Sequence, residues 1–482
     1  MLNIRDFPDH FPEVTVGQIS TPDFNLADSA EVWAARIAAA ADLPDQRLNT
    51  RLADILTTLA RQPNDAIPHA AGNCHHAKSI YRFFQNRRFD HHALVDALAQ
   101  VTAQCYAGQD RVYLVHDSSS LNYGSLKSTT GLGRLGRRER ACGLMLHSVL
   151  ALSPDGIVRG LLALDLWSRP LHQKTWRQRY QRRFEDKESF KWLRGLSSAR
   201  AAFNNTLAPE RAPRRLHLMD REGDIHQVFE NILAHGESAI IRCAQNRRVD
   251  GSITRAHAAV AASPLLGETT FKVRTKGNKW RKATVQLRAL SVLLLPSQTH
   301  FPDRPPLSLN LIEVRELDAP AGGEPVHWRL WTTESIGNLG DILECLRAYT
   351  LRWRIEEYHL ALKSGCNTEG LLLETAERLC KAIVLYAAVA TRIVALRDLG
   401  RHSPDAPCTV LLSHEECRVL SARFGDARQS GTIPTIRQAM LWIGRLGGHL
   451  GRKRDGLPGV RTLWRGWRDL AIMVYGYRLS RY

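Results

Sequence analysis

The chain has 482 residues, of which 44% are hydrophobic and 24% are charged. This length is more than one hydrophobic core can serve, so we expect two to four domains, and the composition excludes a disordered protein. The formal net charge of +18 exceeds what solubility needs and favours a polyanionic partner, with nucleic acid as the leading candidate.

Neither a membrane protein nor a disulfide-bonded scaffold is expected. No apolar run approaches the roughly 20 residues that a membrane-spanning helix needs, and residues 1–13 lack the apolar core of a signal peptide, so we expect a cytoplasmic protein. The nine cysteines include no Cys-x-x-Cys pair, which argues against zinc ribbons and disulfide networks. The adjacent residues Cys74, His75 and His76 cannot easily share one tetrahedral ion.

The first predicted elements, from about residue 27 to residue 105, are helices. Apolar residues recur at helical spacing between residues 48 and 59, whereas Arg47, Arg51 and Arg61 fall on the more polar sides. The pattern predicts a small helical module with a basic face.

The character of the chain changes at residue 112, where a short, mostly apolar run ends in a carboxylate, Asp117. We expect a buried strand with Asp117 at its C-terminal end. A loop rich in glycine and arginine follows, to about residue 140. Two strand-like runs, 144–152 and 157–167, then flank a Ser-Pro-Asp-Gly turn, which predicts a hairpin.

A second acidic strand end follows a charged, helical segment from about residue 174 to residue 207. Residues 216–219 form another apolar run, which ends at Asp220. A helix-like stretch to residue 234 and a strand over 239–242 come next. The predicted order is therefore strand, hairpin, helix, strand, helix, strand.

The next segment, about 247–333, is expected to be mostly β because its apolar runs alternate or are β-branched. Residues 274–282 form a basic, hairpin-like tip, which is either merely exposed or in contact with DNA. From residue 342 onward the chain is again helical. The expected fold class is α/β: an RNase H-like mixed sheet flanked by helices, with a mostly β insertion, between helical N-terminal and C-terminal domains.

Four chemically suited side chains share one face of a predicted helix. On a helix that advances about 100° per residue, Tyr349, Arg352, Glu356 and Lys363 fall within about 60° of one another. Glu357 would point away from that face. Taken alone, the pattern also fits an ordinary ladder of i,i+4 ion pairs on a solvated helix.

Asp117, Asp220 and Glu356 would converge in an RNase H-like sheet, because its first strand and a later one are neighbours and a following helix delivers a third acid. Three carboxylates raise one another's pKa unless a cation intervenes, and oxygen-rich ligation without sulfur suits two Mg²⁺ or Mn²⁺ ions. Two such ions, about 3.5–4 Å apart, activate an attacking water or 3′-hydroxyl and stabilise the leaving oxygen at phosphorus. The other side chains of the helix face would bind DNA phosphates beside the metals: Tyr349, Arg352 and Lys363.

Three motifs, in order and spacing, are typical of one family. Residues 116–121 read His-Asp-Ser-Ser-Ser-Leu, residues 220–225 read Asp-Arg-Glu-Gly-Asp-Ile, and residues 349–363 contain Tyr-x2-Arg-x3-Glu-x6-Lys. The sequence resembles the insertion-sequence-four group of DDE transposases, whose YREK signature is the last of these motifs. Similar stretches at 47–52 and 443–450 extend the resemblance over nearly the whole chain.

The resemblance implies three domains: a helical DNA-end-binding domain (1–90), an RNase H-like catalytic domain with the β insertion (91–398) and a helical dimerisation domain (399–482). It implies catalytic and metal-binding roles for the three acids and DNA contacts for Arg242, Arg47 and Arg51. Trp328 and Trp353 would correspond to aromatic residues that cradle a base flipped from the transposon end during hairpin formation, although core packing is the other reading for either tryptophan.

The implied activity is cut-and-paste transposition by a bacterial, nucleoid-associated homodimer. Its partners would be double-stranded DNA, both the transposon end repeats and the target, with no membrane. One alternative is a catalytically silent, transposase-derived DNA-binding regulator, which predicts a lost acid, whereas all three are present. Another is a different RNase H-like nuclease, such as a junction resolvase, against which the signature helix and the β insertion count.

Overall fold

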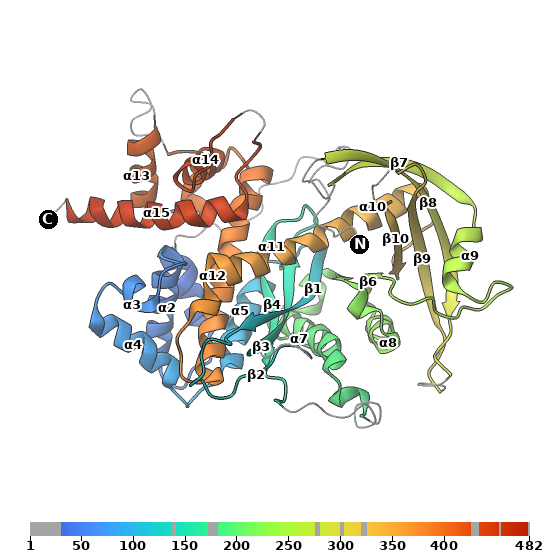
Figure 1. Ribbon diagram of the computed structural model, residues 1–482, viewed down its shortest axis with the longest axis horizontal. Coiled ribbons are helices and arrows are strands. Elements are labelled where there is room, and N and C mark those ends of the chain that lie inside the picture. Colours follow the sequence, from blue (N-terminus) through green and yellow to red (C-terminus); the bar gives the residue numbers. More distant parts are fainter. Residues whose placement is uncertain are drawn as a thin grey trace.

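The computed structural model describes residues 30–136, 141–171, 182–274, 280–298, 303–319, 325–425, 433–452 and 455–480. Figure 1 shows the N-terminal and C-terminal helices together at one end of the molecule and a β-rich region at the other. Residues before 30, and parts of the expected basic loop, charged segment and basic tip (137–140, 172–181 and 275–279), lie outside the described residues. The expected α/β class is confirmed.

In the described part of the chain, ten strands form one sheet in the order β2-β3-β1-β5-β6-β10-β9-β8-β7, with β4 paired to β3. The core strands are β1 (Arg111–Asn122), β2 (Gly133–Arg134), β3 (Cys142–Leu152), β4 (Val158–Trp167), β5 (Arg214–Met219) and β6 (Ser238–Arg242). β1, β5 and β6 are parallel neighbours, and β3 and β4 form an antiparallel hairpin beside β1. This is the strand order of an RNase H-like core, as expected.

The hairpin forms where the sequence predicts it. In its turn, Gly156 adopts a φ of 87°, and its N–H donates to the Ser153 carbonyl at 2.8 Å. Only glycine adopts such a φ without strain, so the turn chemistry fixes the register of β3 and β4.

Asp117 does not end its strand, contrary to expectation, but lies in the middle of β1. The parallel pairing of β1 with β5 ends at Val115, and residues 117–122 then pair antiparallel with residues 143–148 of β3. The residues directly after Asp117 are polar, so the apolar pattern that predicts a strand stops at Asp117. The strand continues because it pairs with β3. Asp220, by contrast, directly follows β5 as expected.

The expected β insertion is confirmed and continues the same sheet. It contains the strands β7 (Leu265–Arg274), β8 (Trp280–Leu294), β9 (Leu307–Glu316) and β10 (His327–Thr332), with the short helix α9 (Ala256–Ala262). Antiparallel pairing of β10 with β6 joins the insertion to the core.

The helices before and between the core strands lie within the expected segments, although α7 begins only after two 3-10 turns (Phe184–Asp186 and Glu188–Phe190). The N-terminal module contains α1 (Ala30–Ala40), α2 (Gln46–Arg61), α3 (Ile67–Ala70), α4 (Cys74–Gln85) and α5 (His91–Gln104). Two further helices, α7 (Lys191–Thr206) and α8 (His226–Ala234), separate β4, β5 and β6. The side chain of Asp45 caps α2 by accepting from the Arg47 N–H, which fixes where that helix begins.

The stretch with the predicted helix face is less regular than expected. α10 (Leu339–Thr350) passes through a 3-10 turn (Leu351–Trp353) into α11 (Arg354–Leu360), which ends in a π turn (Ala361–Gly365). The backbone stays right-handed at these junctions. The assumption of one ideal helix is therefore wrong in detail, because tertiary packing changes the turn type locally.

One helix of the described residues, α12 (Ala376–His402), is apolar and long enough to cross a membrane by composition alone. This contradicts the sequence-based statement that no run approaches that length. Its most apolar window is entirely buried inside the protein, as in the core helix of a folded domain. The chain continues with α13 (His414–Phe424), α14 (Ile436–Leu446) and α15 (Val460–Leu479).

Candidate active site

Three acids from separate elements lie at one edge of the core. Val115 and Leu218 are the last paired residues of the parallel strands β1 and β5. Asp117 follows Val115 by two residues, and Asp220 follows Leu218 by two residues. Glu356 lies in the first turn of α11, which packs against β1. Parallel strands carry equivalent positions to the same edge of a sheet, so the fold brings the two aspartates together.

Arg352 lies among these acids. Its Nη2 is 3.1 Å from Glu356 Oε1 and its Nη1 is 3.9 Å from Asp117 Oδ2, and its charge opposes the rise in the pKa of Asp220 that burial causes. The i,i+4 pair of Arg352 and Glu356 therefore exists. It is not part of a solvated ladder, however, because Arg352 is only 4% exposed and faces an acid of a remote strand.

The acid cluster, defined as Asp117, Asp220 and Glu356, has more negative charge than Arg352 balances. Burial raises the pKa of Asp117 to about 7, Arg352 opposes this shift, and Asp220 and Glu356 add to it. Burial also raises the pKa of Asp220. Carboxyl groups with raised pKa values bind protons readily, and they would be stabilised as anions by added positive charge.

The donor chemistry of the acid cluster fits Mg²⁺ or Mn²⁺, which prefer carboxylate oxygens. Across the ranges that the structure describes, no three His, Cys, Asp or Glu side chains converge closely enough to enclose one ion. Arg352 faces both Asp117 and Glu356 in this arrangement. The residue types therefore fit divalent metals, while metal binding by these residues stays a prediction.

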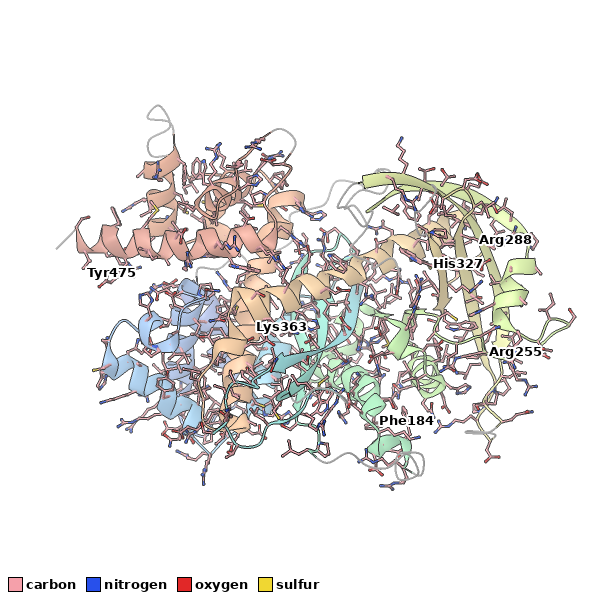
Figure 2. All side chains as sticks on the ribbon, in the orientation of Figure 1. Phe184, Arg255, Arg288, His327, Lys363 and Tyr475 are labelled. Carbon is pink, nitrogen blue, oxygen red and sulfur yellow. The ribbon has the colours of Figure 1, made fainter. Side chains whose placement is uncertain are left out.

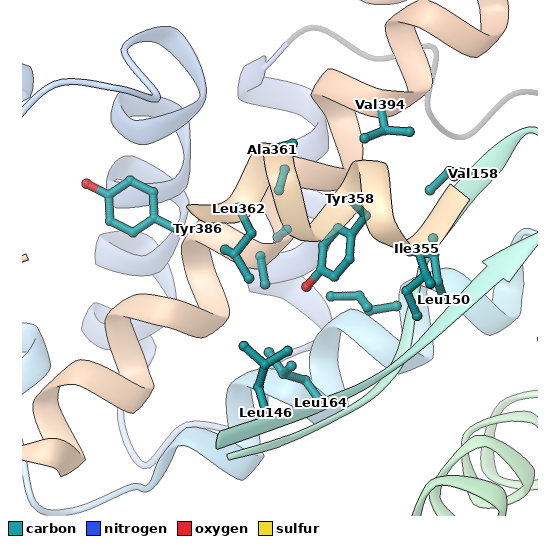
Figure 3. Packing of buried hydrophobic residues seen from close by; sticks show 14 of the residues in the cluster. Leu146, Leu150, Val158, Leu164, Ile355, Tyr358, Ala361, Leu362, Tyr386 and Val394 are labelled. Atoms are coloured by element: carbon teal, nitrogen blue, oxygen red, sulfur yellow. The ribbon is translucent and has the colours of Figure 1, made fainter. Parts of the chain in front are cut away.

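The side of the signature helix opposite the acids is apolar and firmly packed. Figure 3 shows Ile355, Tyr358 and Leu362 of this stretch against the β3–β4 hairpin and α12. Ile355, Tyr358 and Leu362 are fully buried. This packing fixes the rotation of α11 and hence the direction in which Glu356 points.

Tyr349 and Lys363 remain near the acid cluster despite the irregular helix. The ring of Tyr349 is fully buried, and the positive charge of Arg352 opposes the rise in its pKa that burial causes. Lys363 stands on the π turn, where burial lowers its pKa and the charges of Glu369 and Asp117 oppose this shift. Figure 2 shows Lys363 where α11 and α12 meet.

The predicted DNA contact Arg242 and the predicted base-stacking residue Trp328 lie together. The Arg242 guanidinium is 5.1 Å from the centre of the Trp328 ring and donates to the His327 carbonyl at 2.9 Å. Trp328 is 6% exposed, stacks on Phe271 and meets Tyr349 edge-on. Trp328 is thus packed in this conformation, and base stacking stays a prediction.

The remaining predicted contacts are more accessible. Trp353 is half-buried on the 3-10 turn beside Arg352. On α2, Arg47 is exposed and Arg51 is half-buried. His76, in the cysteine–histidine segment, pairs with Asp54 at 2.9 Å.

Comparisons with known families match both helical ends of the chain. Residues 30–89 match the family Transposase DNA-binding, and residues 388–482 match the family Transposase Tn5 dimerisation domain. The chain is a Tn5-like transposase. It binds DNA through its N-terminal helices and forms homodimers through its C-terminal part.

In this transposase a second polar cluster lies on another side of α11, and little in the sequence pointed to it. Arg397 of α12 pairs with Glu357 and with Asp398, and Arg354 lies 3.3 Å from Glu357 and 3.6 Å from Asp398. Asp398 also accepts from the Val158 N–H at 3.3 Å. We call Arg354, Glu357, Arg397 and Asp398 the anchor cluster, because it ties α11 to α12 and to the hairpin.

Proposed function

We propose that this transposase acts by cut-and-paste transposition. It nicks the transposon ends, excises the element through a hairpin intermediate and joins the 3′ ends to target DNA. One observation supports this proposal above all others: acids from β1, from the end of β5 and from α11 surround a single buried arginine. A DNA-binding protein without catalysis has no need for buried carboxyl groups with raised pKa values.

Asp117, Asp220 and Glu356 would hold two divalent ions, Mg²⁺ or Mn²⁺. When bound, such ions activate the attacking oxygen and stabilise the leaving oxygen in an in-line displacement at phosphorus. Arg352 and Lys363 lie beside the acids and are suited to hold the phosphate that reacts. Trp353 is accessible enough to stack on an extruded base, and Trp328 would have to be uncovered first.

Dimer formation would bring two transposon ends together, and α15 offers a surface for it. Ile472, Tyr475 and Leu479 are each more than half exposed and follow one another at helical spacing. An exposed apolar stripe on a DNA-bound dimer is explained by a second copy of this chain. Tyr475→Lys is therefore expected to shift the dimer to monomer in light scattering, whereas Leu372→Lys, an exposed leucine outside α15, leaves it dimeric. A dimeric Tyr475→Lys protein would contradict this use of α15.

The test of the proposed activity uses a labelled duplex that carries the flanking element end, with purified protein and Mg²⁺. We expect nicked and hairpin products from the native protein and none from Asp117→Ala. Binding of the duplex without any cleavage would favour the silent regulator. Cleavage of branched junctions in preference to element ends would favour another RNase H-like nuclease.

A further inference from the structure

His359 of α11 is buried beside the acid cluster, and the proposed function gives this side chain no role. It follows Glu356 by three residues and is 6% exposed. Its Nδ1 lies 3.9 Å from Asp117 Oδ2, and its Nε2 lies 3.3 Å from Ser148 Oγ. Ser148 is the cross-strand partner of Asp117 in the pairing of β3 with β1. The imidazole therefore joins three elements around Asp117.

The hydrogen-bonding chemistry of this imidazole is decided by its neighbours. The Nδ1 side of the imidazole faces the Asp117 carboxylate, and its Nε2 side faces the Ser148 hydroxyl. In the tautomer with its N–H on Nε2, the lone pair of Nδ1 would face the Asp117 carboxylate, which is repulsive. When Nε2 instead accepts from the Ser148 hydroxyl, Nδ1–H faces the carboxylate, which is attractive.

The two oxygens of Asp117 then have different surroundings. Oδ1 accepts from the Ser118 N–H at 2.9 Å, which ties it to the backbone. Oδ2 lies between the Arg352 guanidinium and the His359 imidazole, each 3.9 Å away. Together these neighbours hold the carboxylate in one orientation.

We propose that His359 is a positioning residue: its Nδ1–H orients the Asp117 carboxylate, and the affinity of the acid cluster for a divalent ion depends on this contact. The proposal rests on the proposed metal-dependent function. Groups beside metal ligands that orient them typically contribute 10- to 100-fold in metal affinity, because they fix the ligand before the ion arrives.

Two isosteric variants separate this role from simple packing. The amide of Asn places a donor where Nδ1 stands, and the amide of Gln places one where Nε2 stands. His359→Asn can therefore still reach Asp117, whereas His359→Gln can reach only Ser148. A purely structural role would favour the Gln variant, since that variant preserves the contact with Ser148.

The experiment titrates Mn²⁺ alone into the chelator-treated full-length protein and follows free Mn²⁺ by electron paramagnetic resonance. We expect His359→Gln to weaken binding by about tenfold or more and His359→Asn to stay within about threefold of the native protein. His91→Gln, at the half-buried start of α5, serves as the matched control and leaves binding unchanged. Melting temperatures of all variants are recorded alongside.

If the His359 variants do not fold, Ser148→Ala replaces them, since it removes one hydroxyl and releases the imidazole. We expect it to weaken Mn²⁺ binding about threefold. Native affinity in His359→Gln, an equal loss in both His359 variants, or native affinity in a folded Ser148→Ala protein would overturn the proposed role of His359. A native protein that binds no Mn²⁺ would instead overturn the proposed function itself.

Discussion

Two polar clusters lie on different sides of α11, and adjacent glutamates divide between them. Glu356 belongs to the acid cluster, where Arg352 pairs with Asp117 and Glu356 and its charge also acts on Asp220. Glu357 belongs to the anchor cluster, where Arg354 and Arg397 balance Glu357 and Asp398. The two clusters differ in charge balance more than in residue type.

The consequence appears in the pKa values. In the acid cluster burial prevails and the pKa of Asp117 rises to about 7. In the anchor cluster Arg397 and Arg354 outweigh the burial of Asp398, and its pKa is lowered. A buried cluster that lacks positive charge is suited to receive a cation, whereas a balanced one stabilises the fold.

The largest expected effect separates the two glutamates. Glu356→Gln should reduce end cleavage about a thousandfold or more, because a ligand for the ions is lost, while the free energy of unfolding stays unchanged. Glu357→Gln should keep measurable cleavage and lower the free energy of unfolding. Cleavage assays and urea denaturation measure the two effects. If both variants lost cleavage equally at equal stability, the contrast between the clusters would fail.

A second change removes the balance of the anchor cluster. Arg397→Met keeps most of the side-chain volume but leaves the fully buried Asp398 with Arg354 and the Val158 N–H as its partners. We expect a loss of about 3 kcal/mol in the free energy of unfolding, measured in urea. Arg478→Met, which breaks a part-exposed pair with Glu415, is the control and should cost at most about 1 kcal/mol. An equal loss in the free energy of unfolding for the two variants would show that the anchor cluster stabilises the fold no more than a part-exposed ion pair does.

The smallest expected effect is a dependence of stability on pH in the metal-free protein. The pKa of Asp117 in the folded state, about 7, lies above its ordinary value of 3.8, so between these values the folded state binds more protons than the unfolded state. Stability contributed by Asp117 should therefore fall as the pH rises from about 4 to 7. Asp117→Asn should flatten this slope in thermal melts, and added Mn²⁺ should do the same. If the dependence of stability on pH were unchanged in Asp117→Asn, another titrating group would be its cause.

Much of the fold could be predicted from local sequence. Apolar runs give the core strands and their order, the Ser-Pro-Asp-Gly turn gives the hairpin, and Asp220 stands at the end of β5 as predicted. These features depend on a few neighbouring residues. The pairing that extends β1 past Asp117 depends on residues 143–148, which lie far along the chain.

The signature residues could be recognised, but their surroundings could not. The 3-10 and π turns around α11 follow from packing against the hairpin and α12, which periodicity does not reveal. Arg397 and Asp398 interrupt a long apolar helix, and that was the available sign of the anchor cluster. His359 carried no signal of its own, because its role requires the position of Ser148.

The central claim is that Asp117, Asp220 and Glu356 bind the ions that drive DNA cleavage. The most direct measurement is anomalous diffraction from crystals of the transposase bound to an element-end duplex and soaked in Mn²⁺. We predict two anomalous peaks between these three carboxylates, and their loss in Asp220→Ala. Peaks that lie elsewhere in a complex competent for cleavage would contradict the account.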